Sequence, residues 1–169
     1  ITVATAGSYT VEYTDGNGCK ATSAATTVTV NTLPVAAVNS ETICAGDPAV
    51  TFIATSATAV GWSWSENGTG TLQNTSGTIA GNYTVVVTDA NGCESAPATG
   101  VLTVNALPAA PTITAGGPTT LCDGESVVLT SSEATGNVWS TTETTQAITV
   151  ATAGSYTVEY TDGNGCKAT

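Results

Sequence analysis

The most constraining feature of this sequence is a repeat that is identical letter for letter. Residues 1–22, which read ITVATAGSYTVEYTDGNGCKAT, recur as residues 148–169, an offset of 147 residues. A diverged echo lies between these copies, because residues 81–93 (GNYTVVVTDANGC) resemble residues 154–166 (GSYTVEYTDGNGC). Each unit of the repeat therefore contains two related domains of about 73 residues, and we expect a tandem array.

Two Leu-Pro pairs, Leu33-Pro34 and Leu107-Pro108, mark the junctions between these domains. The chain begins inside a predicted strand, so we interpret it as a segment of a longer array. Three parts are predicted: residues 1–32 as the C-terminal strands of a preceding domain, 33–106 as a complete domain, and 107–169 as a second domain that lacks its last strand.

The composition indicates an all-β fold. Thr occupies 36 of the 169 positions and Met is absent, and β-branched residues favour strands. Between residues 155 and 161 apolar and polar side chains alternate, which is typical of a half-buried strand. The strands predicted for the second domain lie at residues 111–121, 126–131, 137–141, 147–151 and 155–161.

The charge of the chain excludes several classes of function. Two Lys and Arg residues stand against 13 Asp and Glu, His is absent, and the net charge is −11. Binding to nucleic acid requires basic residues that displace counterions, so we expect no nucleic-acid partner. Most general bases and phosphate-binding sites need His, Lys or Arg, so we predict no enzyme and no cofactor. No apolar stretch approaches the roughly 20 residues of a membrane span, and no membrane insertion of this segment is expected.

The motif Asp-x-Asn-Gly recurs at residues 89–92 and 162–165. Asn and Gly tolerate the positive φ angles of a tight hairpin, so we predict turns. Calcium binding is a weaker alternative, because a calcium loop would bring more carboxylates together. We therefore predict no metal site.

Aromatic residues recur at matching positions of the two domains. In each domain one Trp lies in the third predicted strand, and one Tyr follows Gly-x at the start of the strand that corresponds to residues 155–161. Trp62 has no aromatic counterpart, because its position holds Asn137. It is therefore the best candidate for an exposed ring that contacts a sugar or a neighbouring chain, although packing at the edge of its strand is the favoured interpretation. Four aromatic residues are predicted to lie in the cores: Trp64, Trp139, Tyr83 and Tyr156.

The order of these motifs resembles a known group of proteins. The Trp and the Gly-x-Tyr resemble the core Trp and the tyrosine corner of immunoglobulin-like sandwiches. The full series is Cys-x-Gly-[Asp/Glu], Trp, Ala-Gly-x-Tyr-Thr-Val and Thr-Asp-x-Asn-Gly-Cys. It is similar to the immunoglobulin-like and PKD-like tandem repeats of giant surface adhesins of Bacteroidota, including gliding-motility adhesins exported by type IX secretion. The resemblance covers the whole chain.

This resemblance implies tandem immunoglobulin-like β-sandwich domains in an extracellular, cell-surface protein. It implies a structural segment of an adhesin filament or stalk, whose partners are neighbouring copies of the same repeat in the same chain. Surface polysaccharide and other filament chains are further candidate partners. The alternative function is a carbohydrate-binding or spacer module of a secreted multidomain hydrolase.

Five cysteines without Cys-x-x-Cys spacing favour structural disulfides over zinc in such a protein. In an immunoglobulin-like sandwich, the turn between the first two strands and the turn between the last two lie at opposite ends, roughly 26 Å apart for strands of about eight residues. Bonded cysteines need Cα atoms about 5.5 to 6 Å apart. The first of these ends faces the second end of the next domain, so a bond between Cys44 and Cys166 across the junction is favoured. The alternative pairs within domains are Cys44 with Cys93 and Cys122 with Cys166, which leave Cys19 for an upstream domain.

Overall fold

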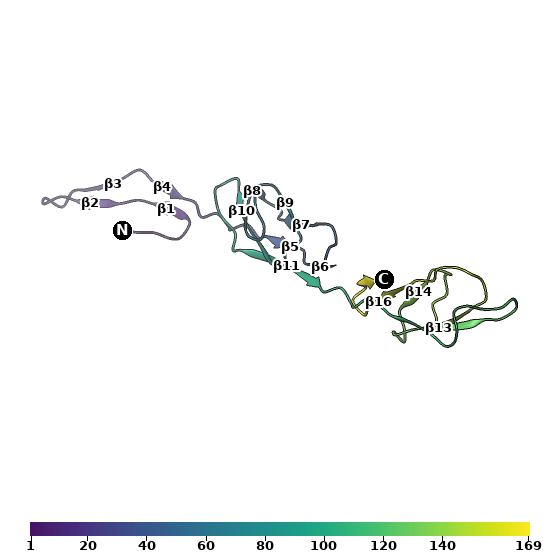
Figure 1. Ribbon diagram of the computed structural model, residues 1–169. Helices are drawn as coiled ribbons and strands as arrows, with labels where there is room; N and C mark the ends of the chain where they lie inside the picture. The colour runs from purple at the N-terminus through teal and green to yellow at the C-terminus, as the bar shows by residue number, and fades with distance from the viewer.

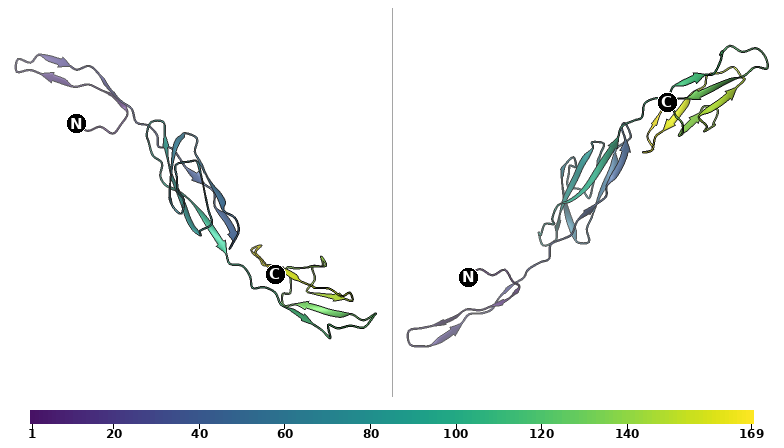
Figure 2. Two further views of the ribbon diagram at one scale, coloured as in Figure 1. Left: turned by 45° about the horizontal axis from the view of Figure 1, so that its top comes forward. Right: turned by 90° about the horizontal axis from the view of Figure 1, so that it is seen from below.

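The computed structural model describes all 169 residues, and its regular elements are strands. An N-terminal segment, a middle domain and a C-terminal domain follow one another along an elongated molecule (Figures 1 and 2). The protein has no helix with the length and apolarity that crossing a membrane would require. The all-β prediction is confirmed.

The middle domain is a sandwich of two sheets with the orders β6-β11-β10-β8 and β5-β7-β9. Neighbouring strands are antiparallel except β6 and β11, which are parallel. The first strand of the domain is thus divided between the two sheets, as β5 and β6. This is an immunoglobulin-like β-sandwich, as predicted. The strands are β5 (Ala37–Val38), β6 (Glu41–Cys44), β7 (Val50–Thr55), β8 (Ala59–Glu66), β9 (Asn74–Gly77), β10 (Gly81–Asp89) and β11 (Ala98–Asn105).

The C-terminal domain has two three-stranded sheets, β12-β13-β15 and β14-β16-β17. Its first strand is much shorter than the predicted range 111–121, because Gly116, Gly117 and Pro118 follow β12 and interrupt sheet pairing. The strands are β12 (Ile113–Ala115), β13 (Val127–Ser131), β14 (Asn137–Trp139), β15 (Ala147–Val150), β16 (Val158–Thr161) and β17 (Lys167–Ala168).

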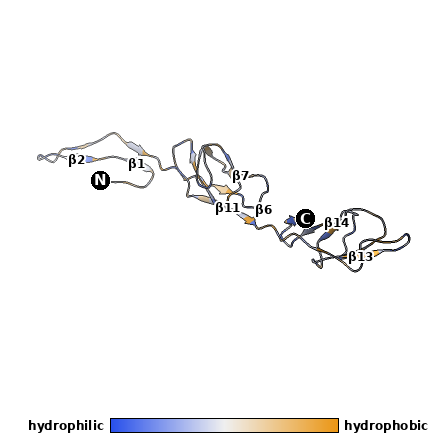
Figure 3. Cartoon of the chain, viewed as in Figure 1, coloured by the Kyte–Doolittle hydropathy of each residue, from blue (hydrophilic) through white to orange (hydrophobic).

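The N-terminal segment consists of two strand pairs and has no buried residue among residues 1–32. β1 (Gly7–Tyr9) pairs with β4 (Thr26–Val28), and β2 (Glu12–Thr14) pairs with β3 (Lys20–Thr22), both antiparallel. The hydrophilic colour of β2 contrasts with the hydrophobic residues of β7 in the middle domain (Figure 3). The segment therefore has strand pairing without a core of its own.

Identical sequences adopt different structures in the two copies of the repeat. Residues 7–9 form β1 because β4 lies beside them, whereas residues 154–156 have the same sequence and form no strand. The C-terminal domain has no strand that corresponds to β4 or to β11. The predicted strand at residues 155–161 accordingly starts only at Val158, because an edge without a partner lacks its ladder of hydrogen bonds.

Each sandwich encloses a core around one tryptophan. Trp64 is 6% exposed and Trp139 is 2% exposed. The indole N–H of Trp64 donates to the carbonyl of Leu72, and that of Trp139 donates to the carbonyl of Thr145, both at 2.9 Å. Each buried indole thus has its hydrogen bond satisfied. The other core residues are Ile43, Phe52, Ala54, Tyr83, Val85, Val87 and Leu102 in the middle domain, and Val127, Leu129, Ile148 and Val158 in the C-terminal domain.

In each part of the chain, the hydroxyl of one tyrosine donates a hydrogen bond back to the loop that precedes it. Tyr83 is fully buried, stacks on Phe52 with ring centroids 4.0 Å apart, and donates to the carbonyl of Ile79 at 3.1 Å. Tyr9 and Tyr156 also donate to the carbonyl four residues upstream. Tyr156 packs against the second core but remains half-buried. These contacts are those of the tyrosine corner.

The Trp139→Ala substitution is expected to destabilise the C-terminal domain by roughly 3 to 5 kcal/mol, because loss of a buried indole leaves a cavity. Urea unfolding followed by circular dichroism measures this cost. Val138→Ala is the matched control, since the neighbouring Val138 side chain lies on the opposite face and is 43% exposed. Equal midpoints for the wild-type chain and Trp139→Ala would contradict the assignment of this core.

A copy of residues 23–32 added after Thr169 is expected to restore the absent strand. An open groove of about 510 Å³, lined by apolar residues such as Leu121, Val127 and Leu129, lies in this domain. The added segment should pair with residues 154–156 as β4 pairs with β1, and so slow hydrogen exchange of their amides. The same added residues in scrambled order serve as the control, and equal protection from both extensions would show that the pairing does not form.

Candidate functional site at the domain junction

A tight turn at residues 162–166 holds one cysteine at the end of its hairpin. Oδ1 of Asp162 accepts hydrogen bonds from the backbone N–H groups of Asn164 at 2.9 Å and Cys166 at 2.8 Å. The N–H of Gly165 donates to the carbonyl of Asp162 at 3.1 Å. Gly165 has a φ of 84°, in the left-handed region that favours glycine. The carboxylate therefore fixes the backbone on both sides of the cysteine. We call this arrangement the aspartate turn.

The aspartate turn recurs at residues 15–19 and 89–93 with the same carboxylate and backbone bonds. In the middle domain, the N–H of Cys93 lowers the pKa of Asp89 below its usual value, and the N–H and side chain of Asn91 lower it further, while burial opposes the shift. A depressed pKa means that the charged form stabilises the fold at neutral pH. This contribution is lost as the pH falls through the folded-state pKa.

A second type of turn holds the other bonded cysteine. The N–H of Cys44 donates to Oδ2 of Asp47 at 2.8 Å, and the N–H of Asp47 donates to the carbonyl of Cys44 at 3.1 Å. Gly46 adopts a φ of 92° between them. Cys122 and Glu125 repeat both bonds at the same lengths. We call the turns at residues 44–47 and 122–125 the cysteine-glycine turns.

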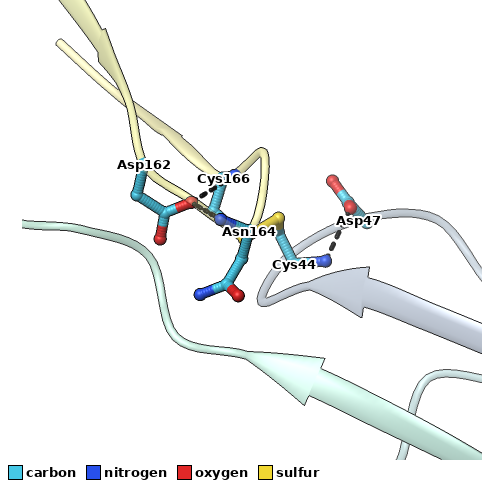
Figure 4. Close-up of a disulfide and its surroundings, with 5 residues drawn as sticks. All are labelled: Cys44, Asp47, Asp162, Asn164 and Cys166. Atoms are coloured by element: carbon cyan, nitrogen blue, oxygen red, sulfur yellow. Dashed lines mark hydrogen bonds between the residues drawn. A yellow bond between two sulfur atoms is a disulfide. The ribbon is translucent and has the colours of Figure 1, made fainter. Parts of the chain in front are cut away.

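The structure joins Cys44 to Cys166 by a disulfide, with Cα atoms 5.6 Å apart and 122 residues of sequence between the two positions. Figure 4 shows the two sulfur-bearing side chains meeting between a cysteine-glycine turn of the middle domain and the aspartate turn of the C-terminal domain. Cys166 is 1% exposed and Cys44 is half-buried. The bond across the junction, rather than either pair within a domain, is the one that the structure contains.

Cys44 lies beside the point at which the chain leaves the middle domain. It pairs with Asn105 at the end of the parallel β6–β11 ladder, and the N–H of Ala45 donates to the carbonyl of Asn105 at 2.8 Å. The linker to the next domain starts immediately after Asn105. Two covalent connections, the linker and the disulfide, therefore leave the middle domain side by side.

The three remaining cysteines are free thiols on turns of the same two types. Cys19 and Cys93 end aspartate turns, and Cys122 starts a cysteine-glycine turn. Cys19 and Cys122 are exposed, and Cys93 is half-buried. Each of these free cysteines therefore lies in the same type of turn as one of the two bonded cysteines.

Trp62 packs inward, as the favoured interpretation had it, and is not the exposed ring for which it was the best candidate. It is half-buried, packs against the core of the middle domain, and has its Nε1 atom buried without a hydrogen-bond partner. Trp62 and Trp64 are two residues apart on β8, so both point inward. Asn137, at the matching position of the C-terminal domain, is likewise buried at 1% exposure. The alternation of the strand was the signal for this position.

Sequence reasoning also missed the role of the carboxylate in Cys-x-Gly-[Asp/Glu]. In the sequence the motif contributes only to a resemblance, whereas in the structure the carboxylates of Asp47 and Glu125 each accept a hydrogen bond from the backbone N–H of the cysteine three residues earlier. Asp and Glu commonly form such local bonds to backbone amides, so the spacing was an available signal.

No protein-family model matches this chain, and no curated protein matches it. Among solved structures, it is similar to the fibronectin(III)-like modules of CbhA from Clostridium thermocellum, with 18% sequence identity and a TM-score of 0.39. The similarity covers 63% of this chain and 66% of that chain, which is just under two thirds of its length.

Cleavage after glutamate is expected to map the disulfide without ambiguity, because it places each cysteine on a different peptide. After free thiols are blocked, non-reducing mass spectrometry should find peptide 42–66 joined to peptide 160–169. A link from 42–66 to 67–94, or from 95–125 to 160–169, would instead establish pairing within domains. The five cysteine peptides are 13–41, 42–66, 67–94, 95–125 and 160–169.

Proposed function

We propose that this chain is a structural segment of an extracellular filament or stalk of a large cell-surface adhesin, and that its task is to join domains end to end. The observation that carries this proposal is the disulfide between Cys44 and Cys166, which links two successive domains. A disulfide within a domain would stabilise that domain alone. A disulfide between domains also fixes how they are joined.

The repetition of both turns supports an array. The aspartate turn occurs three times and the cysteine-glycine turn twice, each with the same hydrogen bonds. Stacked repeats contact only their neighbours, so length can grow by the addition of units. The partners that we propose are therefore neighbouring copies of the same repeat.

An oxidising environment outside the cell supports formation of such a bond. The resemblance of the motifs to repeats of Bacteroidota adhesins supports a cell-surface location and, within that group, export by type IX secretion. We expect no catalysis, since the chain has no His and only two basic residues. Both Lys residues form exposed ion pairs, Lys20 with Glu12 and Lys167 with Glu159.

The alternative, a carbohydrate-binding module of a secreted hydrolase, depended on an exposed Trp62 side chain. Stacking on a sugar requires an exposed aromatic face, and Trp62 packs against the core. The second candidate function is therefore a spacer module of a secreted hydrolase. This candidate predicts that the full-length polypeptide has hydrolase activity.

Electron microscopy of the oxidised chain tests the joining of domains. Particles should show a narrow distribution of angles between the middle and C-terminal domains, and the Cys44→Ser variant should show a broad one. Cys122→Ser is the matched control, because it removes a free cysteine of the same turn type and should leave the angles unchanged. Equal distributions for the wild-type chain and Cys44→Ser would contradict a joining role for the disulfide.

Antibodies against the chain test the cellular part of the proposal. They should label fibres or stalks on intact cells, and the intact parent polypeptide should show no glycoside hydrolase activity. Turnover by that polypeptide would overturn the adhesin assignment in favour of the hydrolase.

A further inference from the structure

The disulfide closes a covalent ring around nearly all of both sandwiches. Cys44 follows the first strands of the middle domain, and Cys166 lies three residues before the last residue of the chain. Residues 45–165 all lie inside this ring. They include the linker and strands β7 to β16, which carry most of both cores.

The ring matters because of the direction of the strands that enter and leave the middle domain. β6 and β11 are parallel neighbours with the register Leu102 to Glu41 and Asn105 to Cys44. Both strands therefore run toward the junction, where β6 ends in the disulfide and β11 ends in the linker (Figure 2). Two adjacent covalent connections, the disulfide and the linker, can therefore transmit a pulling force from the middle domain to the C-terminal domain.

We propose that the disulfide carries tension past the sandwiches, so that a chain pulled by its ends cannot be drawn out domain by domain. This inference rests on the proposed filament function for its biological purpose, although the ring itself can be measured independently. Force enters through residues 1–44, crosses from Cys44 to Cys166, and leaves through residues 166–169. The residues between the two cysteines remain outside the tensioned path even if both sandwiches unfold.

The repeat extends this path to a full array. Cys166 corresponds to Cys19 through the offset of 147 residues. If every junction is bonded like the observed one, the first covalent track consists of residues 19–44 in each repeat. The free thiols supply a second track, residues 93–122, when Cys122 bonds the Cys93 of the following repeat. The two tracks lie side by side in β11 and β6.

Strands account for 12 of the 26 residues in the first track and 11 of the 30 in the second. Strands are already extended, so stretching a track adds much less length than unfolding both domains would. An extended residue spans about 3.3 to 3.6 Å, so the ring withholds about 400 Å of chain from extension. A polypeptide array without such rings would lengthen by the full contour of each domain that unfolds. The bonded array should instead lengthen only along its tracks, because the residues inside each ring are withheld from extension.

Single-molecule force spectroscopy on residues 1–169, with handles at both ends, tests this proposal. The oxidised chain should reach a maximum length about 400 Å shorter than the chain in dithiothreitol. Cys44→Ser should recover the full length without a reductant. Cys122→Ser, the matched control, should retain the short length. Because contour length is measured on the stretched chain, the full length of Cys44→Ser does not depend on whether that variant folds normally.

An oxidised chain that reaches the reduced length would overturn the proposal. Shortening by about 150 to 180 Å would also overturn it, because that is the length withheld by a ring from Cys44 to Cys93 or from Cys122 to Cys166. Shortening by about 310 to 330 Å would do the same, because both of these rings together withhold that length. Any of these results would also remove the joining bond from the proposed function, whereas the repeated turns would still support an array of domains. Hydrolase activity of the parent polypeptide would instead remove the filament function and leave the ring in place.

Discussion

The parallel pairing of β6 with β11 is the constraint on which the junction depends. Because the first and last strands of the middle domain run in the same direction, Cys44 and the start of the linker after Asn105 reach the same end of the sandwich. An antiparallel arrangement would send one of them to the opposite end, beyond the reach of a disulfide. The next domain brings the turn that carries Cys166 to that end, and the bond follows from this placement.

Both turns prepare their cysteine for the bond by the same physical means. A carboxylate oxygen accepts hydrogen bonds from backbone amides beside the thiol, from Asp162 in one turn and from Asp47 in the other. A glycine with positive φ completes each turn. Since the two cysteines are already held in tight turns, forming the bond orders little additional chain, which is the general advantage of preorganised groups. Some of the carboxylates that make this protein acidic thus also stabilise the turns that carry the bonded cysteines.

The sequence was sufficient to predict the features that depend on local chemistry. The buried Trp139, the tyrosine corners and the tight Asp-x-Asn-Gly turns follow from side-chain size, alternation and turn propensity.

Features that depend on a distant partner were less accessible. Residues 7–9 and 154–156 have one sequence and two structures, because only the first has β4 beside it. The inward position of Trp62 follows instead from its alternation with Trp64 along β8, which is local. The division of the first strand between two sheets also depends on pairing with β11. Glu41 and its partner Leu102 are 61 residues apart in sequence, which is beyond the reach of any local pattern.

The covalent ring changes what cleavage of the backbone would do to this molecule. Proteases cut a folded chain preferentially at its exposed loops. In an ordinary chain of domains, one cut in a linker releases everything beyond it. Here a cut anywhere between Cys44 and Cys166, including the linker itself, leaves both fragments attached through the disulfide. Only the additional loss of the disulfide would separate the two domains, so the exposed linker can be cut without parting them.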